Sequence, residues 1–119
     1  MNKVIDLCKQ ILTCLEKGNY NSLREPNALS RVSEEDIKRV LKEYGGCIST
    51  IPNGAFQTSA FRIYRYHDNS GLKIDLDLWM NGEWSDLTLQ IEVKTDSNNN
   101  IDNYRIMDVL VCKIETKFL

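Results

Sequence analysis

The sequence lacks the motifs of the common enzyme classes. Its 119 residues contain no G-x-S-x-G, Walker or dinucleotide-binding motif and no H-E-x-x-H, so the usual signatures of hydrolases, nucleotide-binding enzymes and zinc peptidases are absent. The single histidine, His67, has no nucleophile or carboxylate at a spacing expected for a catalytic partner. We therefore expect His67 to be a surface residue and the protein not to be an enzyme.

Cysteine motifs are missing as well. The four cysteines are Cys8, Cys14, Cys47 and Cys112. They form no C-x-x-C pair, and one histidine is too few to complete a zinc site, so we expect no metal and no cofactor. The opening sequence MNKVIDLCKQILTCLEKG is broken by polar residues and lacks a small-residue cleavage site. Without an export signal we expect a cytoplasmic protein with reduced, mostly buried thiols.

Long apolar runs and strong charge are missing too. No stretch of 18 apolar residues exists, which argues against a membrane-spanning helix. A net charge of -2 and a pI of about 5.4 give no general attraction to nucleic acid or to an anionic membrane, and would suit a basic partner. The length and the 42% hydrophobic content predict one domain over residues 1–119.

The first 46 residues have helical periodicity. Val4, Leu7, Ile11 and Leu15 recur at helical spacing and predict a helix over Asn2–Lys17. A short helical turn is expected around Tyr20 and Leu23, ending near Glu25-Pro26. A further helix should begin after Ser33, a good N-cap, and end at Gly45-Gly46.

From Cys47 onward the period changes to two, which predicts strands. The expected elements are a short strand over Cys47–Ile51, a longer one over Phe56–His67, a hairpin over Leu72–Val93 and a last strand from about Asn103 to Lys113 with a bulge at Met107-Asp108. Helices first and strands after give an α+β fold, with residues 1–46 packed on one face of an antiparallel meander of about four strands formed by residues 47–119.

The hairpin is the most informative stretch. Asn81-Gly82 is a strong signal for a two-residue turn, which places Met80 opposite Glu83. On one face the expected pairs are Leu76 with Leu87, Ile74 with Leu89 and Leu72 with Ile91. On the other they are Trp79 with Trp84, Asp77 with Asp86 and Asp75 with Thr88. The preceding strand would add Phe61 opposite Leu78, Ile63 opposite Leu76, Arg62 opposite Asp77, Tyr64 opposite Asp75 and Tyr66 opposite Lys73.

The second face is the candidate site. Its proposed partner-binding residues are Arg62, Tyr64, Asp75, Asp77, Trp79, Trp84 and Asp86. Tryptophan and tyrosine are enriched at binding hot spots, whereas a solvated sheet face with a salt-bridge cluster, or burial under helices or a dimer partner, would explain the same residues. Facing carboxylates also permit a glycosidase or divalent-metal interpretation, but a small meander seldom provides the cleft or the ligands these need.

The hairpin resembles a small uncharacterised bacterial domain family. That family is marked by a strand ending in Asp-Leu-Trp, a short turn and then Ser-Asp-Leu-Thr-Leu, here Asp77-Leu78-Trp79 and residues 85–89. The helical half matches more loosely, through Tyr20, Leu23 and the helix over Glu34–Gly45. The resemblance implies a cystatin-like or nuclear-transport-factor-like cone, in which a curved antiparallel sheet wraps helices.

The resemblance also implies a function. Small domains of this kind occur as immunity proteins beside bacterial polymorphic and contact-dependent growth-inhibition toxins. We therefore expect a protein that binds and neutralises a cognate toxin domain. A nuclease toxin often has a basic cleft, to which a mildly acidic inhibitor would be complementary. The alternatives are a small-molecule-binding cone, with or without weak enzymatic activity, and a homodimer that uses its sheet as the interface.

Overall fold

A computed structural model describes residues 2–111 of the chain. The helices are α1 (Asn2–Lys17), α2 (Asn21–Arg24), α3 (Glu34–Tyr44) and the 3₁₀ turn η1 (Asn53–Gln57). The strands are β1 (Phe61–Arg65), β2 (Gly71–Met80), β3 (Glu83–Thr95) and β4 (Ile101–Val111). They form one antiparallel sheet in the order β1-β2-β3-β4. The predicted α+β meander is confirmed.

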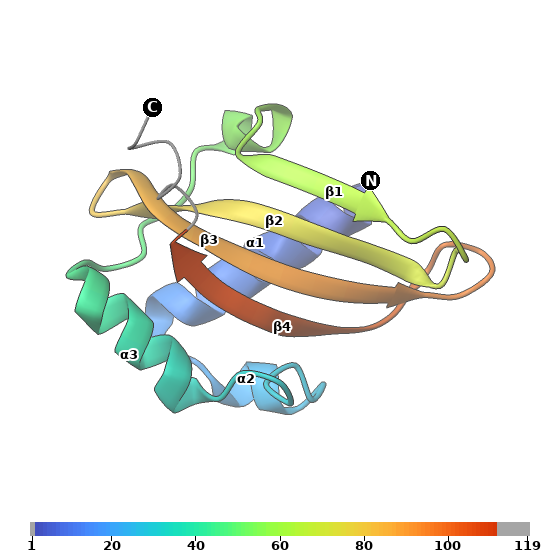
Figure 1. Cartoon of the computed structure of the whole chain (residues 1–119), viewed down its shortest axis with the longest axis horizontal. Helices are drawn as coiled ribbons and strands as arrows, with labels where there is room; N and C mark the ends of the chain where they lie inside the picture. The colour runs from blue at the N-terminus through green and yellow to red at the C-terminus, as the bar shows by residue number, and fades with distance from the viewer. Residues whose placement is uncertain (1, 112–119) are drawn as a thin grey trace.

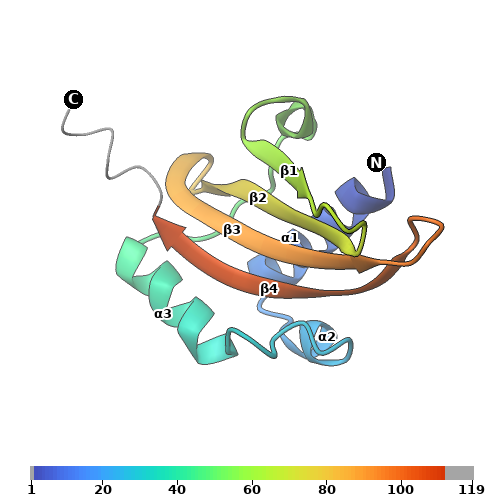
Figure 2. The ribbon, with the colours of Figure 1, turned by 45° about the vertical axis from the view of Figure 1, so that its right-hand side comes forward.

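Within residues 2–111 the helices cover one face of the sheet and leave the other uncovered. Figure 1 shows α1 lying across the back of the curved sheet, with α2 and α3 beside the β4 edge, and Figure 2 shows the same arrangement after rotation. We call the face turned away from α1 the outer face. It carries the predicted site, whereas the inner face holds the core.

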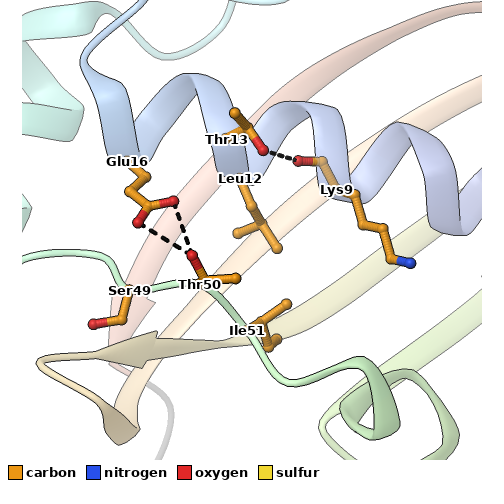
Figure 3. A pocket seen from close by; sticks show the side chains of 7 residues that line it. All are labelled: Lys9, Leu12, Thr13, Glu16, Ser49, Thr50 and Ile51. Carbon is orange, nitrogen blue, oxygen red and sulfur yellow. Dashed lines mark hydrogen bonds between the residues drawn. The ribbon is translucent and has the colours of Figure 1, made fainter.

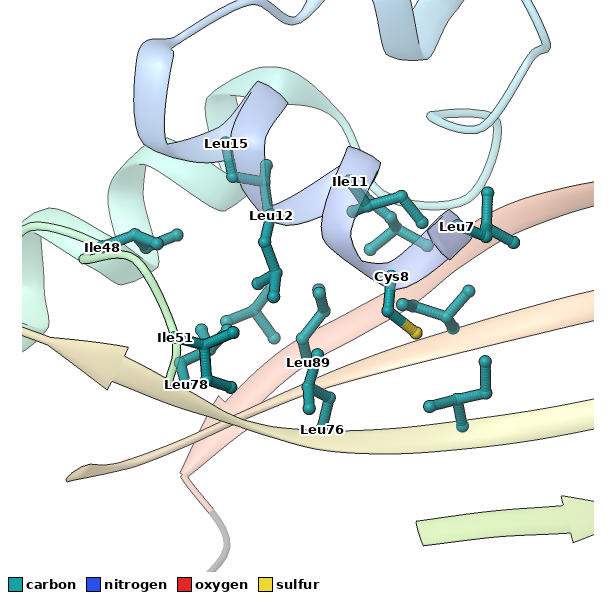
Figure 4. Close-up of a cluster of buried hydrophobic side chains, with 14 of the residues drawn as sticks. Leu7, Cys8, Ile11, Leu12, Leu15, Ile48, Ile51, Leu76, Leu78 and Leu89 are labelled. Atoms are coloured by element: carbon teal, nitrogen blue, oxygen red, sulfur yellow. The ribbon is translucent and has the colours of Figure 1, made fainter. Parts of the chain in front are cut away.

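The core lies between α1 and the inner face. Cys8, Ile11 and Leu12 of α1 are buried, as are Leu76 and Leu89 from β2 and β3, and Figure 4 shows these side chains interleaved between the two layers. Each fully buried leucine or isoleucine contributes about 1.5–3 kcal/mol relative to exposure. This layer therefore accounts for most of the stability and fixes the orientation of the sheet.

The cysteines only partly match the expectation of buried thiols. Cys8 is buried, and this burial raises the pKa of its thiol to about 12, so it stays a neutral packing group. Cys14 is half-buried and Cys47 is exposed, both as free thiols. The prediction was therefore wrong for Cys47, because the segment that carries it runs along the surface. Cys112 lies outside the described residues.

Both predicted long helices and their boundaries are confirmed. The backbone N–H of Asp36 donates to Ser33 Oγ (3.1 Å), and the N–H of Ser33 donates to the Asp36 carboxylate (3.4 Å), which completes a capping box. At the other end Gly45 adopts φ 90°, a left-handed conformation that ends α3. The short turn around Leu23 is α2.

One predicted strand does not form and another is shorter than expected. Residues 47–51 form one isolated bridge, between Ile48 and Met80, instead of a strand. Residues 53–57 form η1, and the hydroxyl of Thr58 donates to Ala55 O (2.8 Å) and accepts from the N–H of Ala60 (3.1 Å). These local bonds satisfy the backbone in place of a ladder, so the strand begins only at Phe61.

Candidate functional site on the outer sheet face

The hairpin turn and its first pairs are as predicted. Asn81 and Gly82 have φ 54° and 80°, as a type I′ turn requires. Met80 pairs with Glu83 and Trp79 with Trp84. The next regular pair is Asp77 with Thr88, so three residues of β3 stand opposite Leu78 alone. The Ser85 hydroxyl lies in this bulge, donating to Leu78 O (2.8 Å) and accepting from the N–H of Leu87 (3.1 Å).

The bulge corrects the predicted register beyond Trp79. Asp77 faces Thr88 and not Asp86, Asp75 faces Gln90 and not Thr88, Leu76 faces Leu89 and not Leu87, Ile74 faces Ile91 and not Leu89, and Leu72 faces Val93 and not Ile91. A shift of two residues keeps every side chain on its predicted face because the side-chain period of a strand is two. The alternation therefore identified the faces correctly and the partners incorrectly.

The β1–β2 register is displaced by two residues in the same way. Phe61 faces Leu76 and not Leu78, Ile63 faces Ile74 and not Leu76, Arg62 faces Asp75 and not Asp77, and Tyr64 faces Lys73 and not Asp75. The predicted pair of Tyr66 with Lys73 is absent for the same reason. The bulge predicted at Met107 is confirmed, since Gln90 pairs with Asp108 and Ile91 pairs with Ile106.

Arg62 and Asp77 still meet, across the diagonal between neighbouring strands. Arg62 Nη2 donates to Asp77 Oδ1 at 3.0 Å and Nη1 donates to Oδ2 at 3.3 Å, while the Thr88 hydroxyl donates to Oδ1 at 3.0 Å. The bond to Asp77 is the main reason the pKa of Arg62 is raised. Asp77 and Asp86 are not paired in this register.

Asp75 lies between basic neighbours. Its Oδ1 atom is buried without a well-oriented hydrogen bond, and Lys73 Nζ lies 3.4 Å away as an ion-pair partner. The Lys73 ammonium also lies over the Tyr64 ring, 5.9 Å from its centroid. Tyr64 itself is 50% exposed. This part of the predicted site is therefore a charge-balanced patch next to an exposed aromatic ring.

Trp79 and Trp84 form an edge-to-face pair, with ring centroids 4.8 Å apart and an interplanar angle of 87°. Trp79 is half-buried and packs against the core, whereas Trp84 is 43% exposed. Aromatic pairs in this geometry contribute about 0.5–1.5 kcal/mol beyond area burial. Trp84 is thus an exposed ring in contact with a half-buried neighbour.

Hydrogen bonds join the turn of the hairpin to residues 47–49, which follow α3. Ser49 N–H donates to Trp79 O (2.8 Å) and Asn81 N–H donates to Cys47 O (2.9 Å). Cys47 N–H donates to Asn81 Oδ1 (3.1 Å) and Gly82 N–H donates to Ser49 Oγ (2.8 Å). The sequence did not predict these four hydrogen bonds, which we call the brace. They stabilise the turn next to the Trp79–Trp84 pair.

Asp86 lies within the bulge and pairs with none of the other predicted site residues. Its backbone N–H donates to the hydroxyl of Tyr44 at 3.0 Å, so this position is tied to the end of α3. The structure thus brings together Arg62, Asp77, Trp79 and Trp84, and places Tyr64 and Asp75 farther along the same face.

A groove lies on the side of the sheet that the helices cover. The groove, of about 170 Å³, lies between α1 and residues 49–51. Figure 3 shows the side chains that line it, Leu12 and Ile51 among them. Its polar groups bond to one another, since the Thr50 hydroxyl donates to the Glu16 carboxylate at 3.3 Å and the Thr13 hydroxyl donates to Lys9 O at 2.9 Å. Over residues 2–111 no group of three or more metal-binding side chains gathers.

The fold is a four-stranded antiparallel meander with helices on one face and a polar and aromatic outer face. The chain belongs to the family described as "Domain of unknown function (DUF7668)", which it matches over residues 12–112. This confirms membership of an uncharacterised domain family. No curated protein and no solved structure matches the chain. None of the described helices is long and apolar enough to cross a membrane.

Proposed function

We propose that this protein is an immunity protein, which binds and neutralises a cognate bacterial toxin domain through its outer sheet face. The observation that carries the proposal is Trp84, a 43% exposed indole in edge-to-face contact with Trp79. Large aromatic side chains that are already ordered lose little entropy on binding and dominate interface energetics. Inhibition by binding needs no catalytic residues.

Two further features support a protein partner. The exposed ring of Tyr64 and the Arg62–Asp77 pair extend the surface along β1 and β2, which gives an aromatic centre with polar groups around it. The interior offers little room for a small-molecule ligand, since buried side chains from α1 and the sheet fill the layer between them. The small-molecule-binding alternative is therefore less well supported.

The test is whether a neighbouring gene encodes a toxin-like domain and whether this protein binds that domain. Wild-type protein should form a complex in isothermal titration calorimetry and restore growth of cells that express the toxin. Trp84→Ala should weaken binding by at least about 2 kcal/mol, as for a hot spot, and Asp77→Lys should weaken it while the fold survives. Glu43→Gln on the exposed surface of α3 is the matched control.

Three results would contradict the proposal, each in a different way. Folded Trp84→Ala and Asp77→Lys variants with unchanged affinity would remove the outer face from the interface. Loss of folding in either variant would assign those side chains a structural role. A stable homodimer in light scattering, disrupted by Trp84→Ala, would replace the toxin with a second copy of this chain.

A further inference from the structure

The outer face has a depression of about 310 Å³ beside the β3 bulge. It is lined by Thr58, Ser59, Ala60, Asp77, Trp84 and Ser85. We propose that this depression receives an arginine side chain of the protein partner, with the guanidinium against the Trp84 ring and bonded to the Asp77 carboxylate. The proposal rests on the proposed function for the source of the arginine.

Two of the three hydroxyls that line the depression donate and accept hydrogen bonds within the protein. Thr58 donates to Ala55 O and accepts from the N–H of Ala60, and Ser85 donates to Leu78 O and accepts from the N–H of Leu87. These two hydroxyls, those of Thr58 and Ser85, thus have no donor left for an anionic guest. This favours a guest that donates hydrogen bonds.

Asp77 supplies an acceptor for such a guest. Its Oδ1 atom accepts from Arg62 Nη2 and Thr88, whereas Oδ2 has a longer contact of 3.3 Å with Arg62 Nη1. That Nη1 group makes a shorter bond of 2.5 Å to Ser59 O. A carboxylate has about four acceptor positions, and the Asp77 side chain is 27% exposed, so Oδ2 retains capacity toward solvent.

Trp84 supplies the aromatic wall. Its contact with Trp79 is edge-to-face and leaves 43% of the residue exposed, so part of the indole is available to a cation. Asp77 is the one charged residue among those that line the depression. An acidic lining residue is complementary to a basic side chain.

Arginine fits better than lysine on chemical grounds. A guanidinium is planar, stacks on aromatic rings and presents several N–H donors in a fixed plane, whereas an ammonium is a compact and strongly hydrated charge. A wall formed by an indole and an acceptor formed by one carboxylate match the planar group. We therefore expect arginine to be preferred over lysine at this position.

The test uses N-acetyl-arginine methylamide and its neutral citrulline counterpart, followed by the NMR signals of the Trp84 indole N–H and the Ala60 amide. Contacts of this strength support only millimolar binding, so the titration extends to about 100 mM. We expect saturable shifts at both signals with arginine and at least about threefold weaker binding with citrulline. Absence of saturable shifts, or equal binding of citrulline, would overturn the inference.

Variants separate this depression from the rest of the face. Asp77→Asn should weaken arginine binding several-fold, and Trp84→Ala should abolish the shift at Ala60. Tyr64→Ala removes a comparably exposed ring outside the depression and should leave arginine binding unchanged. The remaining amide signals report whether each variant is folded. Wild-type arginine affinity in a folded Asp77→Asn or Trp84→Ala variant would also overturn the inference.

The same variants distinguish this inference from the proposed function. If Trp84→Ala weakens the toxin complex but arginine does not bind the depression, the inference fails and the proposed function stands. If arginine binds and Trp84→Ala leaves the affinity for the toxin unchanged, the outer face is not the toxin interface, and the toxin is not the source of the arginine.

Discussion

The hydroxyl of Tyr66 donates a 2.7 Å hydrogen bond to the carboxylate of Glu92, which lies two strands away in β3. Arg105 of β4 donates to the same carboxylate through Nε at 2.8 Å and forms an ion pair through Nη2. Glu92 of β3 therefore connects Tyr66, which directly follows β1, with Arg105 of β4. The bond from Tyr66 is the main cause of a lowered pKa for Glu92, with a further contribution from Arg105.

Replacing Glu92 by glutamine should lower the free energy of unfolding at neutral pH. It should also make that free energy change less as the pH is lowered. A carboxyl whose pKa is lower in the folded state stabilises the fold above its unfolded pKa of about 4.3, and this stabilisation is lost as the pH falls through the folded pKa. We expect Glu92→Gln to cost about 1–2 kcal/mol at pH 7, since the Glu92 side chain is only 13% exposed. Urea denaturation measured from neutral pH down to about pH 3 checks this.

The control for that experiment is Glu43→Gln, which removes the same charge from the exposed surface of α3. It should be nearly neutral in stability and keep the acid dependence of the wild type. Equal stability and equal slope in Glu92→Gln and wild type would show that the network around Glu92 contributes nothing measurable.

Gly71→Ala should destabilise the fold because the start of β2 lies against the backbone of β3. A Cβ atom at this position would lie 2.1 Å from Val93 O and 3.1 Å from Lys94 Cα, and neither backbone atom has room to move. Overpacking of this kind costs about 1–3 kcal/mol. Gly54→Ala is the matched control, since its Cβ would meet nothing within 4 Å. Thermal unfolding of the two variants should differ clearly, and equal midpoints would contradict the predicted clash.

The sequence predicted the parts of the fold that depend on local pattern. The period of 3.6 and the caps at Ser33 and Gly45 placed α1 and α3 within a residue of their observed ends. The Asn81-Gly82 turn gave the Trp79–Trp84 pair, because a two-residue turn fixes its immediate neighbours. The even shift beyond the bulge left the two faces intact, so the core and most of the candidate surface were also predicted.

The remaining features depend on contacts that a periodic pattern does not encode. Ser85 stabilises the bulge through its own hydroxyl, and no glycine or break in the alternation marks that position. The Tyr66–Glu92 bond joins residues 26 positions apart and follows only from the correct register. The hydrogen bonds between Asn81 and Cys47 could not be predicted without knowing the path of the chain after α3. The pattern there predicted a strand, because Ile48 and Ile51 are apolar and indeed buried, but that strand does not form.

Asn81 should have a second role besides the left-handed turn conformation, as the acceptor for the N–H of Cys47 (3.1 Å). Asn81→Gly keeps a residue that adopts φ 54° without strain but removes the acceptor, and should cost about 1 kcal/mol. Asn81→Asp retains an acceptor oxygen and should be closer to the wild type. Hydrogen exchange at the Cys47 amide should accelerate in Asn81→Gly only. Equal exchange in all three proteins would show that the brace does not form in solution.

The two tryptophans should differ in what their removal does to the fold. Trp79 packs against the core, whereas Trp84 is 43% exposed. We expect Trp79→Ala to cost about 3 kcal/mol or slightly less, since the ring is only half-buried, and Trp84→Ala to cost about 1 kcal/mol, mainly the lost aromatic contact. Both variants should lose the exciton signal of the coupled rings in circular dichroism, but only Trp79→Ala should shift the unfolding midpoint strongly. Strong and equal destabilisation by both would mean that Trp84 is a packing residue, and would remove the exposed ring on which partner binding depends.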